Sequence, residues 1–265
     1  MSQAYNEMSY VEVSSIYNDI NNIPLEAAVE LGDAVAAIAG EGARIMDFGG
    51  GAGRISVPSA SKTKMITVDI EYHMLKASKA LAEDRGIPMQ LSVGTVLQLP
   101  FADDTFDAII TTNVLHQVEA WRDALTEAAR VLKPGGVFII GRDILDEESW
   151  AGKLRHQGRM MTAQVNPDMR PTDAAGPTLF QHIAQMGGQP GRPVTACSWT
   201  ESVSPRDILE RMASRTHNET WSLDDNTLNG LMELITPWAE ENIDDLDKKE
   251  DVKWEFGLYP ITGLA

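Results

Sequence analysis

A glycine-rich turn directly after a short apolar run constrains this chain more than any other feature. Residues 45–53 read IMDFGGGAG, an apolar stretch that ends in an acidic residue and continues with Gly49, Gly51 and Gly53 at every second position. Glycines remove side chains, so the backbone of such a turn can approach a ligand closely. In an open α/β sheet this turn lies at the carboxyl edge of the strands, where ligands bind. The stretch therefore predicts a ligand-binding α/β fold.

Short apolar runs alternate with helical patterns through the first half of the chain. Helices are expected at 72–84 and 121–132, between strands at 44–48, 65–68, 89–93, 106–111 and 137–141. This alternation predicts an α/β fold, a Rossmann-like doubly wound and mostly parallel sheet with right-handed crossovers. The residues KPGG at 133–136 are expected to turn the chain sharply into the fifth strand.

The remaining segments are predicted to be helical additions to a single domain of residues 1–265. The expected parts are an N-terminal helical cap at 1–43, a cofactor-binding core at 44–145, helical substrate-lid segments at 146–190 and 204–248, and C-terminal strands at 191–203 and 249–265. A short helix is expected within the cap, over 11–20. Pro58 predicts that the helix after Gly53 is short or begins late, and Pro237 is expected to break or kink a helix over 223–242.

Charge and composition exclude several classes of protein. The chain carries 39 acidic and 22 basic residues, a net charge of −17, so we expect neither nucleic acid nor an anionic membrane as a partner. The polar start of the chain has no apolar segment typical of a signal peptide, and no apolar run is long enough to span a bilayer. Cys197 is the only cysteine, which fits a reducing compartment. A cytoplasmic monomer or homodimer is expected.

Two carboxylates flank the glycine turn. Asp69 ends the second predicted strand, where it can accept hydrogen bonds from both hydroxyls of a ribose, and the helix start after the turn offers N–H groups to a carboxylate. Asp47 either binds an amino group of a cofactor, directly or through water, or satisfies the N–H groups of the turn itself. The dinucleotide fingerprint fails, because Arg54 stands where its last glycine or alanine belongs when the motif is read from Gly49.

With these features the chain resembles the class I S-adenosylmethionine-dependent methyltransferases of the small-molecule type. The resemblance covers residues 43–142 and rests on the ordered set IMDFGGGAG at 45–53, VD at 68–69, LPF at 99–101, FD at 106–107, LH at 115–116 and LKPGG at 132–136. It implies S-adenosyl-L-methionine as the cofactor and S-adenosyl-L-homocysteine as the product.

The resemblance also implies where the cofactor binds. The glycine turn and Asp47 would line its methionine half, Asp69 its ribose, the segment after the third strand its adenine, and Asn113 with His116 its sulfonium. Thr95 departs from the family, which usually has an acidic residue there, so adenine binding would depend on the Val96 N–H and on stacking. The full predicted set is Tyr17, Asp47, Gly49, Gly50, Gly51, Gly53, Asp69, Ile70, Thr95, Val96, Asn113, Val114 and His116.

Three side chains are candidates for acting on the methyl acceptor. His116 is either a base or a wall residue of the cofactor site, and His156 either faces the acceptor or lies on the surface. Arg142, beside Asp143, either binds a polar acceptor or pairs with the lid. No metal site is expected, because the acidic residues at 143–148 resemble a helix N-terminus more than an octahedral Mg²⁺ site.

The preferred hypothesis is an enzyme that methylates O, N or C of a small organic acceptor in secondary metabolism. One alternative keeps the fold and the cofactor but catalyses a reaction without methyl transfer. Two others are an NAD-dependent oxidoreductase and a non-catalytic interaction module.

Overall fold

The computed structural model describes residues 14, 17, 18, 21, 23–169, 174, 176–217 and 219–264. They form two compact units. The first, which we call the sheet unit, comprises Asn22–Asp143, Pro171–Ser198 and Glu255–Ala265. The second, the helical unit, comprises Met1–Asn21, Ile144–Arg170 and Trp199–Trp254. Within the described residues, no helix combines the length and apolarity that crossing a bilayer requires.

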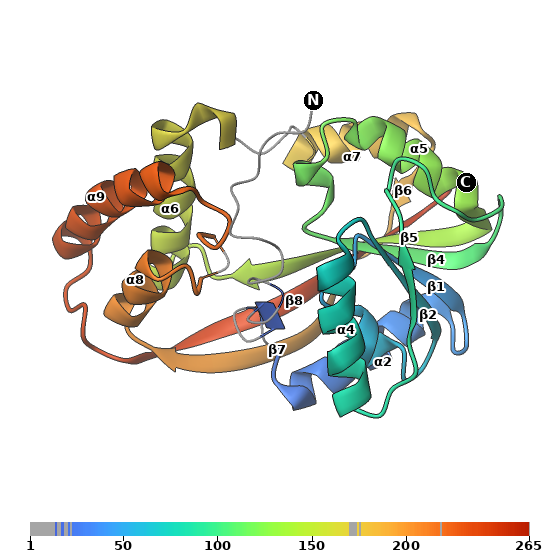
Figure 1. The fold of residues 1–265 in the computed structure, drawn as a ribbon, viewed down its shortest axis with the longest axis horizontal. Coiled ribbons are helices and arrows are strands. Elements are labelled where there is room, and N and C mark those ends of the chain that lie inside the picture. Colours follow the sequence, from blue (N-terminus) through green and yellow to red (C-terminus); the bar gives the residue numbers. More distant parts are fainter. Residues whose placement is uncertain are drawn as a thin grey trace. The chain divides into compact units, whose positions relative to one another are not determined.

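A parallel sheet organises the sheet unit (Figure 1). Its strands lie in the order β3-β2-β1-β4-β5, with bounds β1 Arg44–Phe48, β2 Lys64–Asp69, β3 Gln90–Val93, β4 Phe106–Thr112 and β5 Leu132–Leu145. All four neighbouring pairs are parallel, which confirms the predicted fold class. The strand order reverses between β1 and β4, so the turn after β1 lies at the switch point where ligands bind in such sheets.

Three further strands extend the sheet beyond β5. β8, Glu250–Thr262, neighbours β5, and the two-residue β6, Gln189–Pro190, pairs antiparallel with β8. β7, Val194–Val203, also pairs with β8. Strands are therefore present within both expected ranges, 191–203 and 249–265.

A sharp turn was expected at 133–136, before the fifth strand. In the structure these residues lie within β5, which begins at Leu132. Phe106 of β4 pairs with Leu132 and Ala108 pairs with Val137, so four residues bulge out opposite Asp107 alone. The Lys133 ammonium closes the bulge by donating to Asp107 Oδ1 at 2.6 Å. Two glycines give the backbone the freedom that such a bulge needs.

Helices cover both faces of the sheet (Figure 1). α2 and α4 lie on one face and α5 and α7 on the other, with bounds α2 Leu25–Ala39, α4 Tyr72–Asp84, α5 Trp121–Val131 and α7 Gly176–Gln185. The helix after the glycine turn, α3 Ser56–Ser59, has four residues and contains Pro58, as predicted. α2 packs closely on it, since a Cβ on Gly32 would lie 2.5 Å from the Pro58 carbonyl oxygen.

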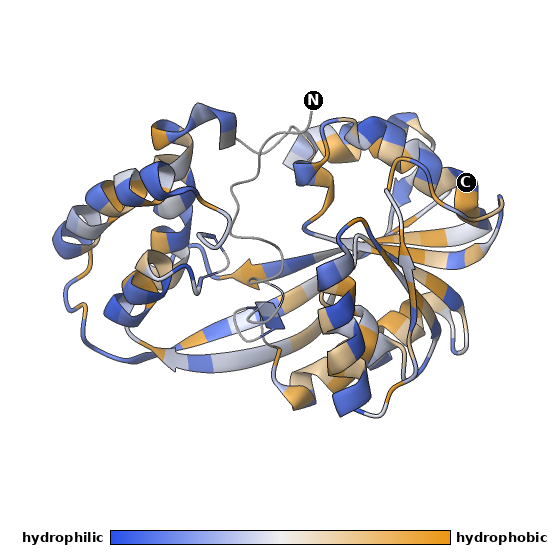
Figure 2. Cartoon of the chain, in the orientation of Figure 1, coloured by the Kyte–Doolittle hydropathy of each residue, from blue (hydrophilic) through white to orange (hydrophobic). Residues whose placement is uncertain are grey.

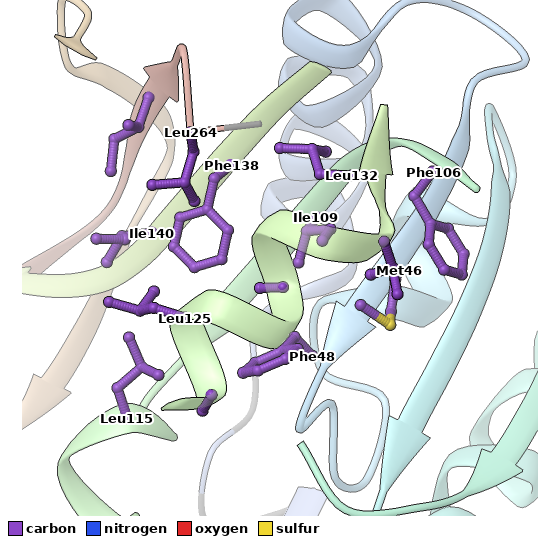
Figure 3. Close-up of a cluster of buried hydrophobic side chains, with 14 of the residues drawn as sticks. Met46, Phe48, Phe106, Ile109, Leu115, Leu125, Leu132, Phe138, Ile140 and Leu264 are labelled. Carbon is purple, nitrogen blue, oxygen red and sulfur yellow. The ribbon is translucent and has the colours of Figure 1, made fainter. Parts of the chain in front are cut away.

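The core of the sheet unit lies between the sheet and α5 with α7 (Figure 3). Phe48, Ile109, Leu125 and Phe138 are fully buried there. On α5 the buried residues recur at helical spacing, from Trp121 through Leu125 to Val131. Figure 2 shows that hydrophilic and hydrophobic residues also alternate around α4 and α9.

The helical unit has its own core under three helices. They are α6 Trp150–Val165, α8 Pro205–Ala213 and α9 Asp225–Asn242, and a short 3-10 helix, Pro167–Met169, follows α6. A capping box between Ser204 and Asp207 fixes the start of α8. Pro237 lies inside α9 without ending it. Of the helix expected over 11–20, Ser14, Tyr17 and Asn18 are helical and the other positions lie outside the described residues.

Candidate functional site

The glycine turn is held by its own backbone and by β2. The N–H groups of Gly49 and Gly50 donate to the Val68 carbonyl at 2.9 and 3.1 Å, and that of Gly53 donates to the Gly50 carbonyl at 3.1 Å. Gly49, Gly51 and Gly53 have φ angles of 76°, 52° and 85°, which L-residues rarely adopt. The N–H groups of these three turn residues are thus used within the protein.

Protein atoms crowd three of the four glycines. A Cβ on Gly49 would lie 2.4 Å from Val114 Cγ2, one on Gly50 2.4 Å from Asp47 Oδ2, and one on Gly53 2.4 Å from Ser78 Oγ. Gly51 differs, because the nearest atoms to its Cβ position are Met74 Cε at 3.4 Å and Asp69 Oδ2 at 3.9 Å. Gly51 is therefore the glycine with room beside it, next to the carboxylate of Asp69.

Asp69 joins the glycine turn to the start of α4. Its Oδ2 accepts from the Gly51 N–H and its Oδ1 from the Glu71 N–H, both at 2.8 Å. Burial raises the pKa of this carboxyl, although the two backbone N–H groups oppose the shift. Each oxygen keeps a second lone pair for a ligand hydroxyl. Ile70, the next residue, is 73% exposed and offers an apolar surface beside this carboxylate.

Asp47 is a buried carboxylate behind the turn. It is 1% exposed, and its Oδ2 has no hydrogen-bond partner within the described parts of the chain. The N–H groups of all four glycines donate elsewhere, so Asp47 does not serve as their acceptor. Burial raises the pKa of Asp47 to about 7, while the nearby Ser56 acts in the opposite direction. A buried, unsatisfied carboxylate oxygen fits an amino group or a water molecule that hydrogen bonds to it.

This raised pKa predicts a pH-dependent stability that Asp47→Asn removes. The folded chain keeps the Asp47 proton up to about pH 7, whereas an unfolded aspartate loses it near pH 4. Between these values the folded state binds more protons, so this group lowers the free energy of unfolding as the pH rises. Urea unfolding at pH 4.5 and 7.5 should show Asp47→Asn gaining stability relative to the unmodified chain at the higher pH. Asp84→Asn, an exposed change at the end of α4, is the control. A stability difference between Asp47→Asn and the unmodified chain that does not vary with pH would exclude a raised pKa.

The segment after β3, predicted to border adenine, forms a small turn. Thr95 Oγ1 accepts from the Leu97 N–H at 3.2 Å, so its hydroxyl already has a local partner. Val96 packs against the core of the sheet unit, and Leu97 is 42% exposed. This turn therefore presents apolar surface, and Thr95 supports its shape.

The segment after β4 lies against the glycine turn. Asn113 adopts a φ of 56°, and its carbonyl accepts from the Gln117 side chain at 2.7 Å. Val114 follows and contacts Gly49, whose missing side chain makes this approach possible. His116 lies half-buried in the 3-10 helix Leu115–Gln117. The structure thus brings the predicted residues after β1 and β4 together.

A buried ion pair that sequence reasoning missed connects the glycine turn to β5. The Arg54 Nη1 and Nη2 atoms donate to Asp143 Oδ2 and Oδ1 at 2.9 and 2.6 Å, and the two side chains are 14% and 6% exposed. The sequence signal was a charged residue at the end of the glycine turn, but its partner is 89 positions away. Asp143 therefore pairs within the sheet unit, with Arg54. The Arg142 guanidinium lies 5.9 Å from the Phe180 ring centroid and 5.8 Å from that of Tyr259.

Two predicted site residues belong to the helical unit. His156 is exposed on α6, and the Tyr17 ring meets the Trp221 ring edge-on at 6.1 Å. Both remain predictions as site residues. Among the described residues no three His, Cys, Asp or Glu side chains are grouped to hold a metal ion. Cys197 is buried, and burial raises the pKa of its thiol to about 11, so it is protonated at neutral pH.

Comparison with known proteins shows which proteins this part of the chain is similar to. Residues 46–140 match the family model described as "Methyltransferase domain". The demethylmenaquinone methyltransferase of Renibacterium salmoninarum is 35% identical over 109 residues, which cover 41% of this chain and 44% of that protein. The chain spans about half the length of the curated relatives it matches.

Two solved structures share the fold at low sequence identity. The YcgJ protein of Bacillus subtilis has a TM-score of 0.59 at 18% identity, covering 89% of this chain and 98% of its own. The [4+2]-cyclase SpnF has a TM-score of 0.58 at 18% identity, covering 96% and 93%. Proteins with different names therefore share this architecture.

Proposed function

We propose that this chain transfers a methyl group from S-adenosyl-L-methionine to O, N or C of a small organic acceptor. The match of residues 46–140 to the methyltransferase family model supports this proposal. The observation that supports this most is the placement of Asp69, whose carboxylate holds the N–H of the one uncrowded glycine of the turn. That arrangement places two acceptor oxygens beside bare backbone at the switch point of the sheet.

The proposed cofactor site follows the ends of β1 to β4. Asp69 accepts the ribose hydroxyls, while Ile70 and the turn at Thr95 and Val96 supply apolar surface for adenine. The glycine turn lies along the methionine half, and the unsatisfied oxygen of Asp47 receives the amino group or a bridging water. The segment from Asn113 through Val114 to His116 borders the reacting end, and we retain Tyr17 as a further contact.

Alignment is the main task of the protein in this proposal. When bound, the cofactor supplies a methyl group already activated by a positively charged sulfur. The chain binds and orients both reactants and excludes water, and orientation of this kind is worth roughly 7–11 kcal/mol. A base is needed only when the acceptor atom is protonated and weakly acidic. His116 and His156 are the proposed bases.

Arg142 is proposed to bind a polar group of the acceptor. The two aromatic rings beside it hold its guanidinium by cation–π contacts, and its N–H groups donate to no atom of the described chain. We further propose a small-molecule acceptor from secondary metabolism, and a cytoplasmic monomer or homodimer. The net charge of −17 supports a partner other than nucleic acid or an anionic membrane.

Binding and product analysis test the proposal together. Calorimetry on the full chain should show uptake of S-adenosylhomocysteine and none of NAD⁺. Incubation of the chain and S-adenosylmethionine with candidate acceptors should then release S-adenosylhomocysteine. Binding without release would favour a reaction of the non-methylating type on this fold. Uptake of NAD⁺ instead would favour an oxidoreductase, and uptake of neither would favour a non-catalytic module.

A further inference from the structure

An ion pair on α5 holds the segment that follows residues 94–98, the turn proposed to border adenine and called the adenine turn below. Glu127 and Arg130 lie three positions apart on the helix. The Arg130 Nε donates to Glu127 Oε2 at 2.8 Å and its Nη2 to Oε1 at 2.6 Å. These bonds lower the pKa of the Glu127 carboxyl, so both groups are charged at neutral pH. The two side chains are 15% and 33% exposed, and their bidentate geometry fixes the direction of the guanidinium.

This ion pair binds the backbone directly after the adenine turn. Glu127 Oε1 accepts from the Leu99 N–H at 2.7 Å. Arg130 donates to the carbonyl oxygens of Leu99 and Phe101 at 3.3 and 2.9 Å, and its Nη1 also donates to Asp103 Oδ1 at 2.7 Å. All three guanidinium nitrogens are therefore used to hold one short segment and the carboxylate beside it. Both backbone polar groups of Leu99 are bound to α5.

α5 gives this segment a rigid support. Leu125 and Val131 of the helix are fully buried in the core of the sheet unit. The end of the helix also binds the same segment through its backbone, because the carbonyl groups of Arg130 and Val131 accept from the N–H groups of Asp104 and Thr105 at 3.1 and 2.9 Å. The chain from Leu99 to β4 is thus attached to a packed helix along its length.

The adenine turn is anchored at both ends. At its start, the Gly94 N–H donates to the Asp69 carbonyl oxygen at 3.0 Å, so the turn begins on the residue proposed to bind the ribose. At its other end, Gln98 is followed directly by Leu99, which the ion pair on α5 holds. A shift of Leu99 would therefore be transmitted to the turn, because its start cannot follow.

The turn keeps one backbone donor for a ligand. The N–H groups of Leu97 and Gln98 both donate to Thr95, to its hydroxyl and its carbonyl oxygen. The Val96 N–H, in contrast, donates to no other residue in the part of the chain that the structure describes. Its side chain packs against the core of the sheet unit. Because a hydrogen bond weakens steeply when its angle is poor, a donor that reads adenine must be held in a fixed direction.

We propose that Glu127 and Arg130 are positioning residues for the adenine of the cofactor, which they align through the backbone of Leu99 without contacting it. This inference rests on the proposed function, because it takes the adenine turn as the adenine site. Adenine offers its N1 atom as an acceptor to the Val96 N–H, whereas the deaminated base of inosine carries a hydrogen on N1. A correctly placed turn therefore selects adenosine over inosine, since the wrong base leaves a donor unpaired.

The ratio of two affinities tests this role. The full chain is titrated calorimetrically with S-adenosylhomocysteine and with S-inosylhomocysteine. The unmodified chain should bind the adenosyl compound about tenfold or more tightly, and Arg130→Gln and Glu127→Gln should each reduce this preference to about threefold or less. Arg130→Lys keeps the charge but not the planar fork, so its preference should be intermediate. Lys79→Gln and Glu83→Gln, which break an exposed ion pair on α4, should leave the preference unchanged.

Amide hydrogen exchange of the free chain adds a measurement that needs no ligand. The Leu99 amide should exchange about tenfold faster or more in Glu127→Gln, because an amide has one acceptor oxygen for donors that now share two. This variant keeps the size of the side chain, so it decides the matter if circular dichroism shows that Arg130→Gln does not fold.

Three results would overturn the positioning role. They are unchanged exchange of Leu99 in Glu127→Gln, folded variants that lose stability but keep the full preference for adenosine, and an unmodified chain that binds both compounds equally. Failure of the unmodified chain to bind S-adenosylhomocysteine at all would instead count against the proposed function, and the exchange measurement would still show whether the ion pair holds the turn.

Discussion

Replacing Asp69 by asparagine is expected to weaken the binding of S-adenosylhomocysteine by about 10- to 100-fold, because hydrogen bonds to charged groups contribute about 1.5–3 kcal/mol. Both carboxylate oxygens already accept a backbone N–H, from Gly51 and from Glu71. In either orientation of an asparagine amide, its NH₂ group faces one of these donors. The substitution therefore removes a charge from the ribose site and also loosens the glycine turn. Calorimetric titration of both proteins at pH 7.5 measures the effect.

Asp84→Asn is the matched control for this change. Asp84 is an exposed aspartate at the other end of α4, so the same chemical replacement should leave the affinity within about twofold. Near-ultraviolet circular dichroism checks that the Asp69→Asn protein keeps its tertiary structure. Full affinity in a folded Asp69→Asn protein would show that the ribose hydroxyls are bound elsewhere, and the proposed cofactor site would then be wrong.

The helices and strands that local sequence patterns define could be predicted best. β1 and α4 begin and end at the residues expected, Arg44–Phe48 and Tyr72–Asp84. In both, the signal is local: an apolar strand stops at a glycine turn, and a helical pattern of buried residues follows Asp69. The order β3-β2-β1-β4-β5 then places the turn at the switch point. Local periodicity and chain breakers were thus sufficient for the cofactor side of the molecule.

Features that depend on distant partners could not be predicted in the same way. The pair of Arg54 with Asp143 joins residues 89 positions apart, and nothing near either residue in the sequence identifies the other. The bulge in β5 depends on its pairing with Asp107 of β4. The same limit applies to the helical unit, where the contacts of Arg155 come from a loop and from β8.

The glycine turn also shows why spacing alone did not reveal what each glycine does. The pattern emphasised Gly49, Gly51 and Gly53, which all have positive φ angles. Gly50 lies between them without a positive φ, yet the site of its missing Cβ is among the most crowded. A Cβ there would lie 2.4 Å from Asp47 Oδ2 and 2.5 Å from Thr67 Cγ2. Its role is steric, since it lets the turn pass directly over a buried carboxylate.

Gly50→Ala is therefore expected to lower the free energy of unfolding by about 2–3 kcal/mol, because the added methyl group must displace buried atoms. Backbone strain contributes little, since the φ angle at this position suits an L-residue. Gly86→Ala is a control in which the added methyl group meets no other atom but the backbone conformation is unfavourable. There the φ angle is +65° and no other atom lies within 4 Å of the Cβ position, so only the left-handed conformation is penalised, by about 1–2 kcal/mol. Urea unfolding of the two variants separates the steric cost from the conformational one.

A double-mutant cycle tests whether contact with Thr67 contributes to the loss of stability in Gly50→Ala. Thr67→Ser removes the Cγ2 atom that the new methyl group would meet, and it keeps the hydroxyl. Combined with Gly50→Ala it should recover part of the lost stability, with a coupling of about 0.5–1 kcal/mol or more between neighbouring sites. The recovery should be incomplete, because the contact with the Asp47 carboxylate remains. Strictly additive effects of the two changes would show that the turn shifts away from β2 as a unit, and the close packing of Gly50 would then not explain the glycine at this position.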